Sequence, residues 1–137
     1  MKLNNWTTTL SDLIESRRHR SFEWGVHDCM LWPSDVVEAL TGKDPAAGLR
    51  GTYSTALSAM RIVKAHEGLK GLVTEQLGRD PVSLSHAQRG DIVMCTSNGL
   101  LCGGVNIGEF GVFVGAGHSG LQFVPHKQLE TFSWRVE

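Results

Sequence analysis

The 137-residue sequence has no long hydrophobic run, no surplus of charge of one sign and only three cysteines. No apolar segment approaches the roughly 20 residues of a membrane-spanning helix, and the N-terminus M-K-L-N-N-W-T-T-T-L lacks the apolar core of a signal peptide. The net charge of -1 gives no reason to expect nucleic acid or an acidic membrane as a partner. We therefore expect a protein that is made in the cytoplasm and binds neither nucleic acid nor membrane.

The cysteines are too few, and spaced too irregularly, for a disulfide framework or a zinc site. Three thiols (Cys29, Cys95 and Cys102) cannot all pair within one chain, which favours reduced cysteines. No C-x-x-C pair is present, so a structural zinc site is not indicated. A mixed metal site of His27, Cys29 and His118 is a weaker alternative. We expect no metal and no other cofactor.

The composition suits one folded domain that spans residues 1–137. Hydrophobic residues make up 41% of the chain and charged residues 20%, which is typical of a globular protein and excludes a disordered one. No repeat or low-complexity tract divides the sequence.

Helical periodicity dominates the first half of the chain. Apolar residues with helical spacing predict a helix from Trp6 to about Arg18, with N-cap hydroxyls offered by Thr7–Thr9. A second helix should begin near Asp28, which can cap its first turn, and should end at Gly42. Two more helices are predicted over residues 53–66 and 69–77, the last ending at Gly78.

The second half changes to short β-type runs. Strands are predicted over residues 91–95, 110–114, 121–124 and 132–136, with turns at 97–99 and 116–118. The glycines of L-C-G-G-V-N-I-G-E-F-G-V indicate a loop and a bulged strand that pass close to another backbone. Helices followed by a strand meander predict an α+β fold, with N-terminal helices packed on an antiparallel sheet of about four strands.

Cys29 lies where the second helix begins, in the run F-E-W-G-V-H-D-C. A helix N-terminus lowers the pKa of a thiol by stabilising its anion, and the free amides there can hold an oxyanion. The contrasting interpretation is a buried structural thiol, which behaves as a small hydrophobic residue. The tight turn at Trp24 and Gly25, followed by a capped helix, makes Cys29 a candidate nucleophile.

These residues resemble a known family. The Trp-Gly turn, the Asp-Cys pair at a helix start, R-G-D-I-V before a strand and F-G-V-F-V-G as a later strand look like the NlpC/P60 group of papain-like cysteine peptidases. The run from Phe22 to Tyr53 most resembles small phage and prophage proteins of that group, which lie among tail genes. The resemblance implies a papain-like fold, Cys29 as nucleophile, Asp28 as its helix cap and cleavage of amide bonds in peptidoglycan stem peptides.

The base of the peptidases is not in its expected place. In that family a histidine opens the second core strand and faces the cysteine. Laying E-F-G-V-F-V-G over that strand puts Glu109 at the position, and a carboxylate with a pKa near 4.3 is a poor base for a thiol near 8.5. His27 and His118 are the candidate replacements, and His126 is a third. His27 has a second interpretation, in which its ring bonds the backbone of the Trp-Gly turn.

Two functions follow from this conflict. In the first, the protein is a tail-associated peptidoglycan amide hydrolase that uses Cys29 with His27 or His118. In the second, it is a catalytically silent structural or assembly component of the phage tail tip. Both predict phage tail proteins as partners and a final place in the virion tail, and the first adds peptidoglycan stem peptides.

Overall fold

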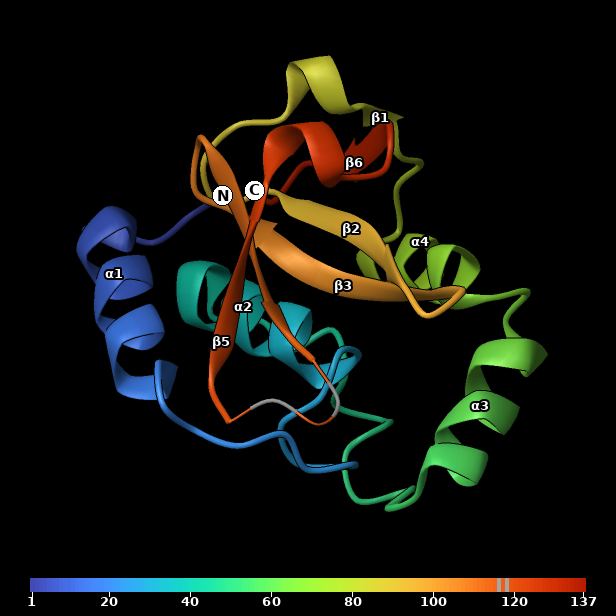
Figure 1. Ribbon diagram of the computed structural model, residues 1–137. Coiled ribbons are helices and arrows are strands. Elements are labelled where there is room, and N and C mark those ends of the chain that lie inside the picture. The colour runs from blue at the N-terminus through green and yellow to red at the C-terminus, as the bar shows by residue number, and fades with distance from the viewer. Residues whose placement is uncertain (116, 118) are drawn as a thin grey trace.

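The computed structural model describes residues 1–115, 117 and 119–137 and confirms the predicted α+β arrangement, with four helices beside an antiparallel sheet (Figure 1). The helices are α1 (Trp6–Arg17), α2 (Leu31–Thr41), α3 (Ala56–Ala65) and α4 (Leu69–Leu77). The strands are β1 (Val82–Ser83), β2 (Ile92–Ser97), β3 (Leu100–Asn106), β4 (Phe110–Val114), β5 (Leu121–Pro125) and β6 (Phe132–Trp134). Two short 3-10 helices, η1 (Leu84–His86) and η2 (His126–Gln128), join the strands.

Helix α1 begins at Trp6 as predicted, whereas α3 begins at Ala56 and not at the predicted residue 53. Gly42 and Gly78 end α2 and α4 in the left-handed conformation, as predicted. The prediction that Thr7–Thr9 cap α1 is wrong: the helix begins at Trp6, so the threonines lie inside it, and the preceding Asn5 makes no side-chain cap bond. No helix in the described residues is long and apolar enough to cross a membrane.

The sheet has six strands in the described residues instead of the four predicted, in the order β1-β6-β2-β3-β4-β5. The main addition is β3, which the glycine-rich sequence had suggested was partly loop. Gly103 and Gly104 reside in this strand because no side chain fits there: a Cβ at Gly103 would press on Pro33 of α2, and one at Gly104 on Phe113 of β4. The predicted close backbone approach is therefore present, within a regular strand.

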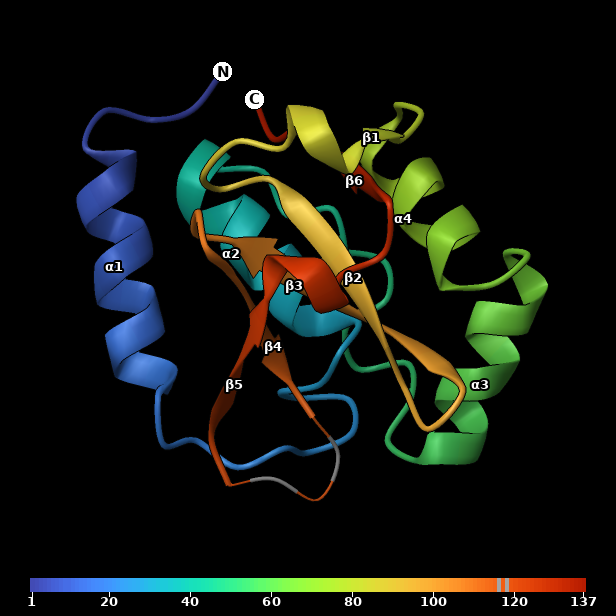
Figure 2. The ribbon, with the colours of Figure 1, turned by 45° about the horizontal axis from the view of Figure 1, so that its top comes forward.

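Helix α2 is the centre of the core. Its buried residues include Leu31, Trp32, Val36 and Leu40, and the Trp32 indole donates a 2.9 Å hydrogen bond to the carbonyl of Val112 on β4. Figures 1 and 2 show α1 and α3 on opposite sides of the molecule with α2 between them.

Helix α3 stands at the margin of the fold, because only Ala59 of its residues is buried. The other face of the sheet carries a smaller apolar cluster of Val93, Cys95, Phe113 and Leu129.

Candidate functional site

A closed turn precedes Cys29. The backbones of Glu23 and His27 exchange two hydrogen bonds of 2.9 Å. Gly25 lies between them with φ at +80°, and a Cβ there would collide with the carbonyl of Tyr53. Only glycine meets both demands, which explains the Trp-Gly pair in the sequence.

Asp28 is fully buried and every bond it makes is structural. Its Oδ1 accepts hydrogen bonds from the amides of Met30 (2.9 Å) and Leu31 (2.8 Å), so it caps the start of α2 as the sequence predicts. Its Oδ2 accepts from the Gly25 amide (2.8 Å) and the Tyr53 hydroxyl (2.6 Å). Burial and this carboxylate raise the pKa of Tyr53 well above its ordinary value. Asp28 thus joins the turn, the helix and the chain after α2.

Cys29 follows this carboxylate in the turn that leads into α2, and the residue is partly exposed. It lines a groove of about 580 Å³ that is bordered by α3 and by the hairpin of β2 and β3. The Cys29 carbonyl accepts a 3.3 Å hydrogen bond from the amide of Gly103. This bond holds the start of α2 against β3, one residue beyond Cys102.

The three cysteines, far apart in the sequence, meet at this point. Cys95 on β2 is directly opposite Cys102 on β3, and all three thiols line the groove. Hydrogen bonding from Cys29 and Cys95 lowers the pKa of Cys102, while hydrogen bonding to Cys102 and burial raise the pKa values of the other two. Cys102 is therefore the most acidic thiol of the cluster, and Cys29 is held in its protonated form.

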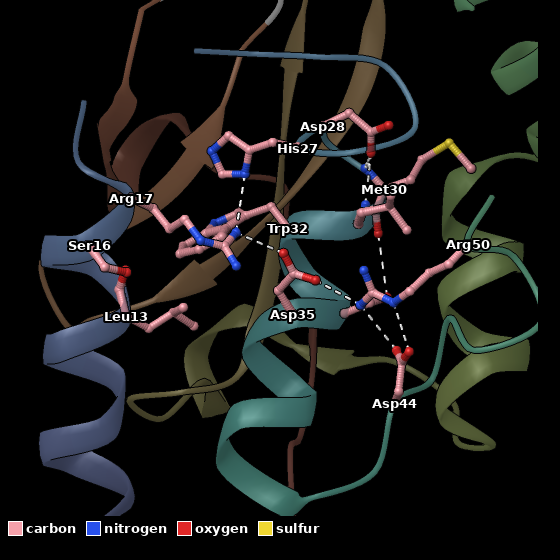
Figure 3. A network of polar contacts seen from close by, with 12 residues as sticks. Leu13, Ser16, Arg17, His27, Asp28, Met30, Trp32, Asp35, Asp44 and Arg50 are labelled. Atoms are coloured by element: carbon pink, nitrogen blue, oxygen red, sulfur yellow. Dashed lines mark hydrogen bonds and ion pairs between the residues drawn. The ribbon is translucent and has the colours of Figure 1, made fainter. Parts of the chain in front are cut away.

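His27 lies away from the groove. Its ring is fully buried between α1 and α2, and Nδ1 is 3.3 Å from the Arg17 guanidinium (Figure 3). Because a guanidinium can only donate, Nδ1 accepts and Nε2 carries the proton. Burial first, then Arg17 and Arg20, lower the pKa of His27 to about 4. The ring bonds Arg17 and not the turn backbone, so neither interpretation of His27 from the sequence describes its position.

A chain of ion pairs beside His27 fixes the start of α2 (Figure 3). Asp35 of α2 accepts from Arg17 of α1 at 2.8 Å and from Arg50 at 2.7 Å. Arg50 also donates to Asp44 at 2.7 Å. These side chains are half-buried, and together with Asp28 they hold α1, α2 and the 44–53 segment around Cys29.

The other candidate bases do not lie opposite Cys29 either. Glu109 is exposed in the turn before β4, whereas β4 approaches the groove at its other end, through Phe113 and Val114. Its placement over the peptidase histidine is therefore wrong, because the strand that contacts Cys29 is β3. His126 bonds Asn106 through Nε2 at 2.9 Å and does not line the groove. His118 lies outside the described residues.

Cys102 is the site residue that sequence reasoning missed. The signal for it was Asn98-Gly99, a pair typical of a two-residue hairpin turn. Read as such a turn, it places residues 100–106 in a strand and Cys102 opposite Cys95, which is the register observed.

The groove is largely apolar, and its polar lining residues, such as Ser97, Asn98 and Gln122, are uncharged amides and hydroxyls. Apolar residues of the wall include Trp24, Met60, Val63, Leu100 and Phe113. Among the lining residues within the described ranges, none is Asp, Glu, Lys, Arg or His. No group of three potential ligands in those ranges is arranged to hold a metal ion, the three thiols included.

The fold and this site define an α+β protein with an uncharged groove whose floor carries three thiols. A family model described as a domain of unknown function, DUF6950, matches residues 1–136, and the chain belongs to this family. No curated protein matches the sequence.

One solved structure similar to this chain is RipD from Mycobacterium tuberculosis, described as a non-catalytic NlpC/p60 domain protein adapted to a peptidoglycan-binding function. The alignment covers 98% of this chain and 100% of the RipD chain, with 14% identity and a TM-score of 0.46. A likeness of this size assigns neither a fold nor a role.

Proposed function

We propose that this protein is a non-hydrolytic binding module with an NlpC/P60-like fold, which acts as a structural or assembly component of a phage or prophage tail. One observation carries the proposal: the side chain that hydrogen-bonds the Cys29 thiol from β3 is that of Cys102. A Cys-His peptidase needs an imidazole there to take the proton of the thiol. A second thiol cannot fill that role.

The neighbours of Cys29 support the absence of hydrolysis. The raised pKa of Cys29 keeps it a thiol near neutral pH, and a thiol is a weak nucleophile. Asp28 accepts four hydrogen bonds from structural donors and has no free position from which to act as a base. The hydrolase hypothesis therefore has a candidate nucleophile without a described partner to activate it.

The chemistry of the groove favours an apolar peptide segment as its occupant. Its described lining residues include Met60, Leu100 and Phe113 but no charged side chain. Peptidoglycan stem peptides carry carboxylates, which are bound best by arginine or lysine. An exposed apolar segment of a tail protein fits this wall better than a stem peptide does.

The tail assignment rests on the resemblance of residues 22–53 to small phage and prophage proteins. On this proposal the protein is made in the host cytoplasm and is then carried in the virion tail.

Hydrolysis can be tested on purified cell walls. We expect the wild-type protein to cause no more loss of turbidity than buffer, and the Cys29→Ala and His118→Ala variants to behave alike. A wild-type turbidity loss that disappears in Cys29→Ala would contradict the proposal and restore the hydrolase. His118→Ala would then show whether that histidine is the base.

Binding can be tested with two variants of the same helix. Met60 lines the groove and is 44% exposed, whereas Leu57 is 63% exposed and does not line it. We expect co-expressed tail proteins of the same phage or prophage to co-purify with wild type and Leu57→Glu. Met60→Glu should reduce this binding at least about tenfold, because it places a charge in an apolar wall.

Sedimentation with purified cell walls separates the two partners. If the wild-type protein sediments with cell walls and Met60→Glu does not, the ligand of the groove is peptidoglycan and not a tail protein. Binding to neither partner would count against the module altogether.

A further inference from the structure

The cysteine cluster has a chemistry of its own. We propose that Cys29 and Cys102 form an oxidisable dithiol site, which reacts with small-molecule disulfides of the glutathione class to give an intramolecular disulfide. The dithiol chemistry does not depend on what the groove binds, or on whether it binds a protein at all.

The backbone brings these two residues close enough for a disulfide. The Gly103 amide nitrogen is 3.3 Å from the Cys29 carbonyl oxygen. The nitrogen is two bonds from the Cα of Cys102, and the oxygen is two bonds from the Cα of Cys29. Standard bond lengths therefore limit the separation of the two Cα atoms to about 8 Å. Disulfides span about 4.4–6.8 Å between Cα atoms, so the start of α2 needs little movement.

Access selects this pair out of the three thiols. Cys29 and Cys102 are both partly exposed and both line the groove, so a disulfide reagent can reach them. Cys95 also lines the groove and packs on the same face of the sheet as Cys102, but it is only 8% exposed and is the one buried cysteine of the three. Cys95 therefore serves as a neighbour that donates to Cys102, not as a partner in the bond.

The order of reaction follows from the hydrogen bonds between the thiols. Cys102 has its pKa lowered by the two flanking thiols and is the attacking thiolate. It attacks one sulfur of glutathione disulfide, forms a mixed disulfide and releases one glutathione thiolate. Cys29 then attacks the Cys102 sulfur, gives its proton to the second departing glutathione, and closes the Cys29–Cys102 bond. One glutathione disulfide is reduced to two glutathione molecules, and two protein thiols are oxidised.

The bond would join the turn that leads into α2 to β3 across the floor of the groove. The hydrogen bond between Gly103 and Cys29 already fixes these segments side by side. Oxidation would therefore seal the floor without changing the fold.

Peptide mapping after oxidation tests the site directly. The full-length reduced protein is incubated with glutathione disulfide, quenched in acid, unfolded, alkylated and analysed by mass spectrometry. We expect a linked pair of peptides that contain Cys29 and Cys102, with Cys95 alkylated. A link between Cys95 and Cys102, or three alkylated cysteines, would overturn the proposal.

Single serine variants test the order of attack. Cys95→Ser should keep the Cys29–Cys102 link. Cys29→Ser should stop at a glutathione adduct on Cys102, because the resolving thiol is missing, whereas Cys102→Ser should leave Cys29 free. An adduct on Cys29 in Cys102→Ser as abundant as that on Cys102 in Cys29→Ser would contradict the assigned roles. The wild-type map decides the proposal even where a variant folds poorly.

Discussion

The phenol of Tyr53 donates a 2.6 Å hydrogen bond to the buried carboxylate of Asp28, 25 residues earlier in the chain. The same oxygen accepts from the amide of Gly25, and the other oxygen caps α2. One side chain therefore sets the geometry of the turn before Cys29, the start of its helix and the segment that covers both. The position of Cys29 therefore depends more on the hydrogen bonds of Asp28 than on contacts of the Cys29 side chain.

Tyr53→Phe tests the contribution of that bond. The variant removes a donor from a buried carboxylate and leaves the ring in place, so we expect a loss of about 1–3 kcal/mol in the free energy of unfolding. Urea denaturation followed by tryptophan fluorescence measures it, with the exposed Leu57→Ala as the control. Equal stability of Tyr53→Phe and wild type would show that the bond contributes nothing net.

Gly25→Ala tests the close approach in the turn. We expect Gly25→Ala to lower the free energy of unfolding about 1–3 kcal/mol more than Gly51→Ala does. Both glycines have positive φ, +80° and +76°, but only Gly25 faces a carbonyl, that of Tyr53, while Gly51 faces open space. The difference between the two variants isolates the steric part. Similar losses of stability in both variants would mean that backbone strain at positive φ explains the effect and that the close approach adds nothing.

The buried His27 predicts a loss of stability in acid. The folded protein binds the His27 proton with a pKa of about 4, because of burial and the nearby Arg17 and Arg20, whereas the unfolded chain binds it near 6.5. Between these values the unfolded state binds more protons, so the stabilisation is complete above pH 6.5 and is lost as the pH falls towards 4.

The free energy of unfolding that His27 costs the protein between pH 6.5 and pH 4 is up to about 3 kcal/mol. His27→Gln, which cannot titrate, should show a flatter dependence of unfolding free energy on pH between 6.5 and 4 than wild type. Carboxylates titrate in both proteins and cancel in the difference. Parallel pH profiles would mean that His27 is protonated as easily in the folded state as in the unfolded chain.

The order of thiol reactivity is the most direct test of the site. We expect iodoacetamide to label Cys102 first, at a rate that changes little between pH 6 and 8, since its pKa is lowered. Labelling of Cys29 should be slow near neutrality and rise in alkaline solution, because its pKa is raised. Mass spectrometry of timed digests gives the three rates. Faster labelling of Cys29 than of Cys102 at neutral pH would revive Cys29 as an activated nucleophile.

Local rules predicted most of the helical half from the sequence. Gly42 and Gly78 end their helices because glycine reaches the left-handed conformation freely, and Asp28 caps α2 because its carboxylate reaches the first amides without help from the rest of the fold. The strand over residues 110–114 was predicted from its own apolar residues. The cap of α1 was assigned wrongly because three adjacent threonines gave a capping signal inside a helix that begins at Trp6.

The site itself was predicted less well, because its composition depends on which strand faces the start of α2. Glu109 was assigned to the peptidase position by likeness of one strand sequence, but strand register and order decide which residue faces Cys29. His27 was favoured for its closeness in sequence, yet residues two apart in a turn can point to opposite sides, and its ring enters the interior beside Arg17.

By itself the sequence determined that a cysteine stands at the start of a capped helix, behind a turn that only glycine can make. Those features depend on neighbours within a few residues and on the conformational limits of single residue types. The tertiary structure alone decided that the cysteine contacts Cys102 and shares a groove without charged residues with Cys95. That outcome required the pairing of β2 with β3 and the contact of Gly103 with Cys29, which join segments up to 74 residues apart (103 − 29 = 74).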